Sequence, residues 1–70
     1  MKVFSIISDE GNRVTVVAED FEAAEPILRR AFEVNDFWGY APDEIEELPY
    51  EGILPEPGRV MISYTYTNRV

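Results

Sequence analysis

Two patterns of apolar residues predict a strand and a helix in the first half of the chain. In residues 14–19 every second side chain is apolar, as in a strand with one buried face. From Phe21 to Val34 the apolar residues recur at intervals of three and four, which indicates a helix with one buried stripe. The pattern changes at Asp20, whose carboxylate can cap the helix by accepting a hydrogen bond from a first-turn N–H.

Pro26 conflicts with the middle of this helix, because proline lacks a backbone N–H and clashes with the preceding turn. The sequence therefore predicts either a helix that begins near Ala23 or a helix with a kink. Asn35 suits a left-handed C-terminal position, so we expect the helix to end near Val34 or Asn35.

Two further stretches are expected to join the same sheet. Residues 3–8 carry apolar side chains on both faces, which suits a strand that is covered on both sides or central in its sheet. The turn-forming residues 9–12 should link this strand to the strand over 13–19 as an antiparallel hairpin. Residues 59–67 alternate clearly and predict the last strand, after a loop over 50–58.

Residues 42–48 allow two interpretations. The first is a short helix, because Pro42 occupies a favoured first helical position and acidic residues follow it. The alternative is a strand with Ile45 pointing inward. The whole pattern predicts one α+β domain over residues 1–70, with three to four antiparallel or mixed strands and one main helix on one face. The expected core residues are Phe4, Ile6, Val14, Val16, Leu28, Phe32, Val60 and Ile62.

Residue content excludes several kinds of site. Cysteine and histidine are absent, which excludes disulfides, thiolate metal sites and Ser-His or Cys-His nucleophiles. The glycines are scattered and Lys2 is the only lysine, so no phosphate-binding loop is expected. Carboxylate pairs remain, and a carboxylate enzyme or a binder of a hard cation such as Mg²⁺ or Ca²⁺ is the third alternative. The leading expectation is no enzymatic activity, no metal and no cofactor. No apolar run reaches the length of a membrane span, which predicts a soluble, cytoplasmic protein.

Charge is the property that bears most on function. Fourteen acidic and six basic residues give a formal net charge of −8, which argues against direct binding to nucleic acids or anionic membranes. All six basic residues lie outside residues 31–58, and that segment holds many of the acids. These acids are Glu33, Asp36, Asp43, Glu44, Glu46, Glu47, Glu51 and Glu56.

Such a segment can imitate a nucleic acid. Acids three or four positions apart on a helix stand about 5–6 Å from each other, and a duplex carries one negative charge per roughly 1.7 Å. Trp38 and Tyr40 lie beside the acids in sequence, and such aromatic residues often anchor interfaces. The alternatives are acids that maintain solubility and rings that cap the core. The candidate partner-binding residues are Asp43, Glu44, Glu46, Glu47, Glu51, Glu56, Trp38 and Tyr40.

One segment of the chain, residues 14–32, resembles segments of known proteins; its sequence is VTVVAEDFEAAEPILRRAF. This segment resembles the strand-then-helix segment of small phage and mobile-element proteins, including anti-CRISPR inhibitors, although Pro26 departs from that pattern. The resemblance implies a short acidic α+β inhibitor that occupies the nucleic-acid surface of a defence complex in the host cytoplasm. No functional residue is carried over from it.

The leading functional expectation is a non-catalytic inhibitor that presents an acidic face to a basic, nucleic-acid-binding protein. The second expectation, from a different class, is a small structural or assembly module. Such a module would be a homodimer through the edge of its last strand, because an exposed strand edge offers unpaired backbone groups.

Overall fold

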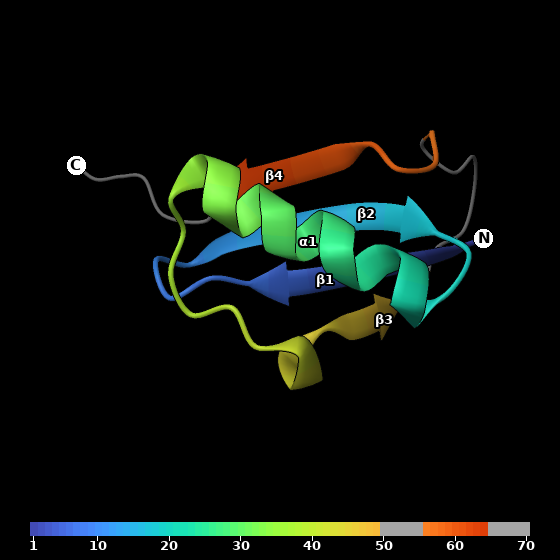
Figure 1. Ribbon diagram of the computed structural model, residues 1–70, viewed down its shortest axis with the longest axis horizontal. Coiled ribbons are helices and arrows are strands. Elements are labelled where there is room, and N and C mark those ends of the chain that lie inside the picture. The colour runs from blue at the N-terminus through green and yellow to red at the C-terminus, as the bar shows by residue number, and fades with distance from the viewer. Residues whose placement is uncertain (50–55, 65–70) are drawn as a thin grey trace.

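The computed structural model describes residues 1–49 and 56–64, which form one antiparallel sheet with a helix across one face (Figure 1). The strands are β1 (Lys2–Ile7), β2 (Asn12–Ala18), β3 (Glu46–Leu48) and β4 (Val60–Tyr64), the helix is α1 (Phe21–Asn35), and a 3₁₀ turn η1 covers Pro42–Glu44. The strand order is β3-β1-β2-β4, and every pairing is antiparallel. The predicted α+β class is therefore confirmed. The part of the last strand predicted over 65–67, and most of the loop predicted over 50–58, lie outside the described residues.

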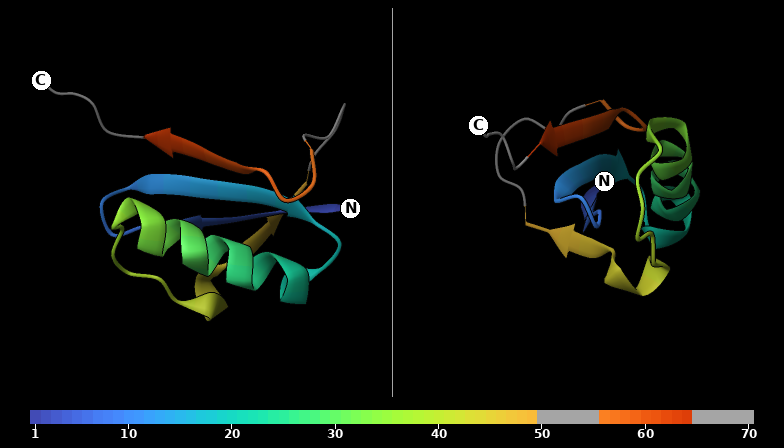
Figure 2. Two further views of the ribbon diagram at one scale, coloured as in Figure 1. Left: turned by 45° about the horizontal axis from the view of Figure 1, so that its top comes forward. Right: turned by 90° about the vertical axis from the view of Figure 1, so that its left-hand side faces the viewer.

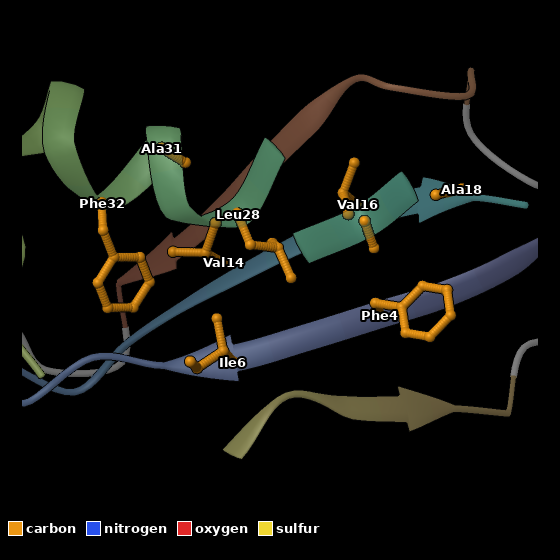
Figure 3. Packing of buried hydrophobic residues seen from close by; sticks show 9 residues of the cluster. Phe4, Ile6, Val14, Val16, Ala18, Leu28, Ala31 and Phe32 are labelled. Atoms are coloured by element: carbon orange, nitrogen blue, oxygen red, sulfur yellow. The ribbon is translucent and has the colours of Figure 1, made fainter. Parts of the chain in front are cut away.

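The strand register explains which apolar residues form the core. Ile6 lies opposite Val14, and Val14 lies opposite Ile62, so these side chains form one row on the face that meets α1. Val60 and Ile62 are only half-buried, because β4 is at the edge of the sheet. The other six predicted core residues are buried, together with Ala18, Ala24 and Ala31 (Figure 3).

The apolar residues of β1 lie on both of its faces, which is the pattern expected of a central strand. β1 pairs with β2 on one side and with β3 on the other. Phe4 faces the helix and Val3 faces away from it, and both side chains are buried. The prediction of a central first strand is confirmed.

The helix begins where its capping residue predicts. The Asp20 carboxylate accepts a hydrogen bond of 2.9 Å from the Ala23 N–H, and α1 begins at Phe21. A start near Ala23 is therefore wrong, and Pro26 lies inside the helix. The left-handed residue at the C-terminal end is Asp36, with φ 58°, one position after the predicted Asn35. In the part of the chain that the structure describes, no helix is long and apolar enough to span a membrane.

The first interpretation of residues 42–48, a short helix, is wrong. A single 3₁₀ turn covers Pro42–Glu44, and residues 46–48 form strand β3 rather than a helix. Ile45 packs against the core, as the alternative interpretation predicted. Viewed toward the end of the sheet, α1 covers one face and β3 forms one edge (Figure 2).

Candidate functional site

A depression of about 330 Å³ lies between the central strands and the segment that leads into β3. Its lining residues are Ser5, Ile6 and Ile7 of β1, Arg13 of β2, Asp43 and Glu44 of η1, and Glu46 of β3. Ile45 holds this segment in place by packing on the core. Glu46 lies directly opposite Ser5 in the β1–β3 pairing, which directs its carboxylate to the sheet face away from α1.

Three carboxylates outnumber one guanidinium in this depression. Arg13 donates a hydrogen bond of 2.7 Å from Nη1 to the Oγ of Ser5, whose side chain is buried. Asp43, Glu44 and Glu46 are exposed, and none of them makes an ion pair with another described residue. Their negative charges therefore face solvent without an ion-pair partner among the described residues, and Arg13, which lines the same depression, is hydrogen-bonded to Ser5 instead.

The other predicted acids lie apart from this group. Glu47 lies opposite Phe4, so it points to the helix side of the sheet, where its carboxylate is 4.0 Å from the Lys2 ammonium. Glu56 precedes β4, and the two central strands separate β4 from β3. Glu51 lies outside the described residues. The helical spacing expected for the acids of residues 42–48 is therefore wrong, because residues 46–48 form a strand that points successive side chains to opposite faces.

The aromatic loop over residues 36–41 is fixed to the β1–β2 turn by its backbone. The Asp9 N–H donates to the Trp38 carbonyl at 2.9 Å, and the Trp38 N–H donates to the Glu10 carboxylate at 3.2 and 3.3 Å. Gly39 has φ 89°, and the Asp9 carboxylate occupies the space that a Cβ there would need. The chain then continues into η1, and Ile7 and Arg13, which flank the hairpin turn, line the acidic depression together with η1.

The rings of this loop divide into anchors and one exposed side chain. Phe37 and Tyr40 pack edge-on against Phe32, with ring centroids 5.9 and 5.2 Å away. The Tyr40 hydroxyl donates to a carboxylate oxygen of Glu25 at 2.7 Å, and burial together with this hydrogen bond raises the pKa of Tyr40. Trp38, in contrast, leaves 67 % of its surface exposed. Of the two aromatic candidates, Trp38 presents its ring to solvent, and Tyr40 holds the loop on the core.

We define the acidic edge as Asp9, Glu10, Asp43, Glu44 and Glu46, together with the exposed side chains of Ile7 and Trp38. Asp9 and Glu10 were not predicted to belong to this edge, because a hairpin turn fully accounts for these residue types in the sequence. The hydrogen bonds from the Trp38 N–H to the Glu10 carboxylate, 28 positions apart in sequence, place Asp9 and Glu10 beside the aromatic loop. No local pattern contains that signal.

Acidification is expected to loosen the Trp38 loop. Desolvation raises the pKa of Glu10, but hydrogen bonds from its own N–H, from Ser8 and from the Trp38 N–H together outweigh it and lower the pKa below the ordinary 4.5. A carboxyl whose pKa is lower in the folded state stabilises that state above its unfolded pKa. This stabilisation is lost as the pH falls from 4.5 through the folded value.

Trp38 is the only tryptophan, so its fluorescence can report this change. Emission is expected to shift as the pH falls below about 4.5 in the wild-type protein. The Glu10→Gln variant should not show this pH-dependent shift of Trp38 emission. A shift of unchanged size in the variant would assign the titration to other carboxyl groups.

The fold and its edge define a small antiparallel α+β protein with an exposed acidic surface and one exposed tryptophan. Among residues 1–49 and 56–64, no three acidic side chains are arranged to hold a metal ion. Comparisons of the chain with models of protein families, with curated proteins and with solved structures gave no match. The chemistry available at this edge is the binding of positive charge.

Proposed function

We propose that this protein is a non-catalytic binding protein whose acidic edge docks on a basic surface of another protein. The observation that carries the proposal is the group of Asp43, Glu44 and Glu46 around one depression, without an ion-pair partner among the described residues. Trp38 lies on the same edge with its ring exposed. Unpaired charges around an open hollow beside an aromatic anchor favour a cationic ligand over a purely solvating role.

A lysine or arginine side chain of the partner fits this depression in both polarity and shape. Its charged end would form charge-assisted hydrogen bonds with the carboxylates of η1 and Glu46. Its aliphatic stem would lie on Ile7, which is 46 % exposed beside the hollow. A second cation could stack on the Trp38 ring. The backbone hydrogen bonds that fix the loop reduce the conformational entropy lost on binding.

The partner class that this chemistry favours is a nucleic-acid-binding protein, because its binding surface is basic and concave. The acidic edge would then inhibit by occupying part of that surface. The resemblance of residues 14–32 to anti-CRISPR inhibitors supports the same class of partner, and it suggests a phage protein that acts in the host cytoplasm. Asp43, Glu44 and Glu46 would replace a few phosphates rather than a long phosphate track.

Charge reversal tests the proposal directly. The edge variant Asp43→Lys, Glu44→Lys, Glu46→Lys and the control variant Glu22→Lys, Glu33→Lys, Glu56→Lys change net charge equally, and all six residues are exposed. Tagged wild-type protein and both variants are used to capture partners from host lysate, and the retained proteins are identified by mass spectrometry. We expect a basic nucleic-acid-binding protein to be retained by the wild type and the control and lost by the edge variant.

Two results would count against the proposal. If all three proteins retain the same partners, the acidic edge is a solvated surface. If both variants lose the partner equally, attraction depends on total charge rather than on this edge. Far-UV circular dichroism of each variant establishes that the fold is intact before the comparison is made.

A further inference from the structure

The outer side of β4 presents backbone groups that no described strand pairs with. The direction of these groups follows from two hydrogen bonds at the ends of β2. The Asn12 carbonyl accepts from the Ser8 N–H, on the β1 side, and the Val17 carbonyl accepts from the Gly58 N–H, on the β4 side. Because these directions alternate along a strand, the odd-numbered residues of β2 bond toward β4.

The register then identifies which backbone groups of β4 point outward. Met61 lies opposite Thr15 and Ser63 lies opposite Arg13, so Met61 and Ser63 bond to β2. The intervening residues Val60, Ile62 and Tyr64 direct their N–H and C=O groups away from the sheet. Natural edge strands are commonly protected by charged residues or proline, and β4 contains neither.

An apolar groove of about 410 Å³ continues from this edge to the neighbouring flank of α1. Its lining residues are Pro26, Ile27, Arg30, Ala31, Val34, Asn35 and Val60. Val34 is 69 % exposed, although it belongs to the apolar side of the helix. The outer edge of β4, with which no described strand pairs, and an exposed apolar helix flank therefore lie side by side.

Charge distinguishes between possible occupants of this side of the molecule. Among the described residues no carboxylate lines the groove, whereas Asp43, Glu44 and Glu46 lie toward the opposite, β3 edge of the sheet. A basic partner finds no counter-charge here. Two copies of a chain with net charge −8 repel each other least through the side from which these carboxylates are absent.

We propose that a second copy of this chain pairs antiparallel with β4 around a two-fold axis at Ile62. In this register Ile62 lies opposite Ile62 of the second copy, and Val60 lies opposite Tyr64. These are the residues whose backbone groups point outward, so each opposed pair exchanges two hydrogen bonds. Met61 then lies opposite Ser63 of the second copy on the face away from α1, and no charged residue of β4 opposes another.

The symmetric pairing joins two sheets into one of eight strands, with the two grooves meeting above the new β4–β4 pair. A stable interface buries about 800 Å² per partner, about a sixth of the 4681 Å² surface of this chain. The strand edge and the helix flank would supply this area together. The two acidic edges would lie at opposite ends of the dimer and could bind two basic sites at once, which raises avidity.

A matched pair of variants tests this register. Met61→Glu with Ser63→Glu places glutamates opposite each other across the axis, and Met61→Lys with Ser63→Glu places lysine opposite glutamate. The variants share the glutamate at 63, which faces Arg13 within the chain. Sedimentation velocity over micromolar to submillimolar concentrations should give a concentration-dependent dimer for the wild type and for the Lys–Glu variant. The Glu–Glu variant should dimerise at least tenfold more weakly.

Hydrogen exchange of the unmodified protein supplies a test that depends on no variant. The Met61 amide, bonded to β2, should be protected at every concentration, and the Ile62 amide should gain at least tenfold protection as the dimer forms. A strictly monomeric wild type would overturn the proposal. So would equal dimerisation of the two folded variants, or Ile62 protection that does not change with concentration.

Discussion

The Phe32→Ala variant is expected to lose about 3–5 kcal/mol of unfolding free energy, as buried phenylalanine truncations do. Phe32 is only 2 % exposed, and its ring packs on both Phe37 and Tyr40. Removing the ring opens a cavity in the core and takes away the support of the aromatic loop. Since domains of this size are stable by only about 5 kcal/mol, the variant should be largely unfolded near 37 °C. Urea titration followed by circular dichroism measures the loss.

Phe21→Ala is the matched control for this substitution. It removes the same ring from the same helix, but Phe21 is 42 % exposed and makes one edge-on contact, with Phe4 at 6.4 Å. We expect a loss of about 1 kcal/mol. Equal losses for the two variants would show that Phe32 is not the link between the core and the acidic edge.

The second large effect is expected at Gly39. Its φ of 89° is unfavourable for any side chain, and a Cβ there would collide with the Asp9 carboxylate. Gly39→Ala is therefore expected to cost about 3 kcal/mol and to shift Trp38 emission, because the loop can no longer dock on the hairpin turn. Thermal unfolding and fluorescence of the variant provide the two measurements.

Gly58→Ala is the control that measures the cost of backbone strain without a steric collision. Gly58 has φ 82°, but an added Cβ would meet no atom within 4 Å, so Gly58→Ala should cost only about 1 kcal/mol. Replacing Asp9 by glycine removes the obstacle at Gly39, and in that background the cost of Gly39→Ala should fall toward the Gly58→Ala value. An unchanged cost would show that Asp9 does not restrict Gly39.

The elements with a strong apolar period were predicted from the sequence because burial imposes that period. α1 buries one face, β2 buries its helix-side residues and also Val17 on the other face, and Asp20 sets the helix start by a local hydrogen bond. The exposure of Val60 and Ile62 was not predicted, because it depends on the strand order. Strand order is set by pairings between distant segments, for which the sequence pattern carries no direct signal.

Residues 42–48 show why the secondary structure of a short segment cannot be predicted from its own residues alone. An isolated helix of this length is marginal, whereas the strand gains pairings with Val3, Phe4 and Ser5 of β1 while Ile45 enters the core. Tertiary contacts therefore override the helix signal of Pro42 and the acids. The same change in structure places Glu46 and Glu47 on opposite faces of the sheet, because successive side chains of a strand alternate.

The candidate site was predicted in part. The acidic segment and Trp38 were identified from composition and from the absence of basic residues over 31–58. Asp9 and Glu10 joined the edge only through contacts with the distant loop. Short-range charge patterns can thus predict that an acidic surface exists, while its membership depends on the folded chain.

The most direct test of the acidic edge is the affinity of the captured partner at two ionic strengths. The Debye length falls from about 10 Å at 0.1 M salt to about 3 Å at 1 M, so binding through exposed charges should weaken at least tenfold over this range. Isothermal titration calorimetry with purified partner supplies both dissociation constants. Strong weakening for the wild type, with binding by the Asp43, Glu44, Glu46 reversal too weak to measure at the lower salt concentration, is the predicted result. An affinity unchanged by salt would contradict binding through the acidic edge.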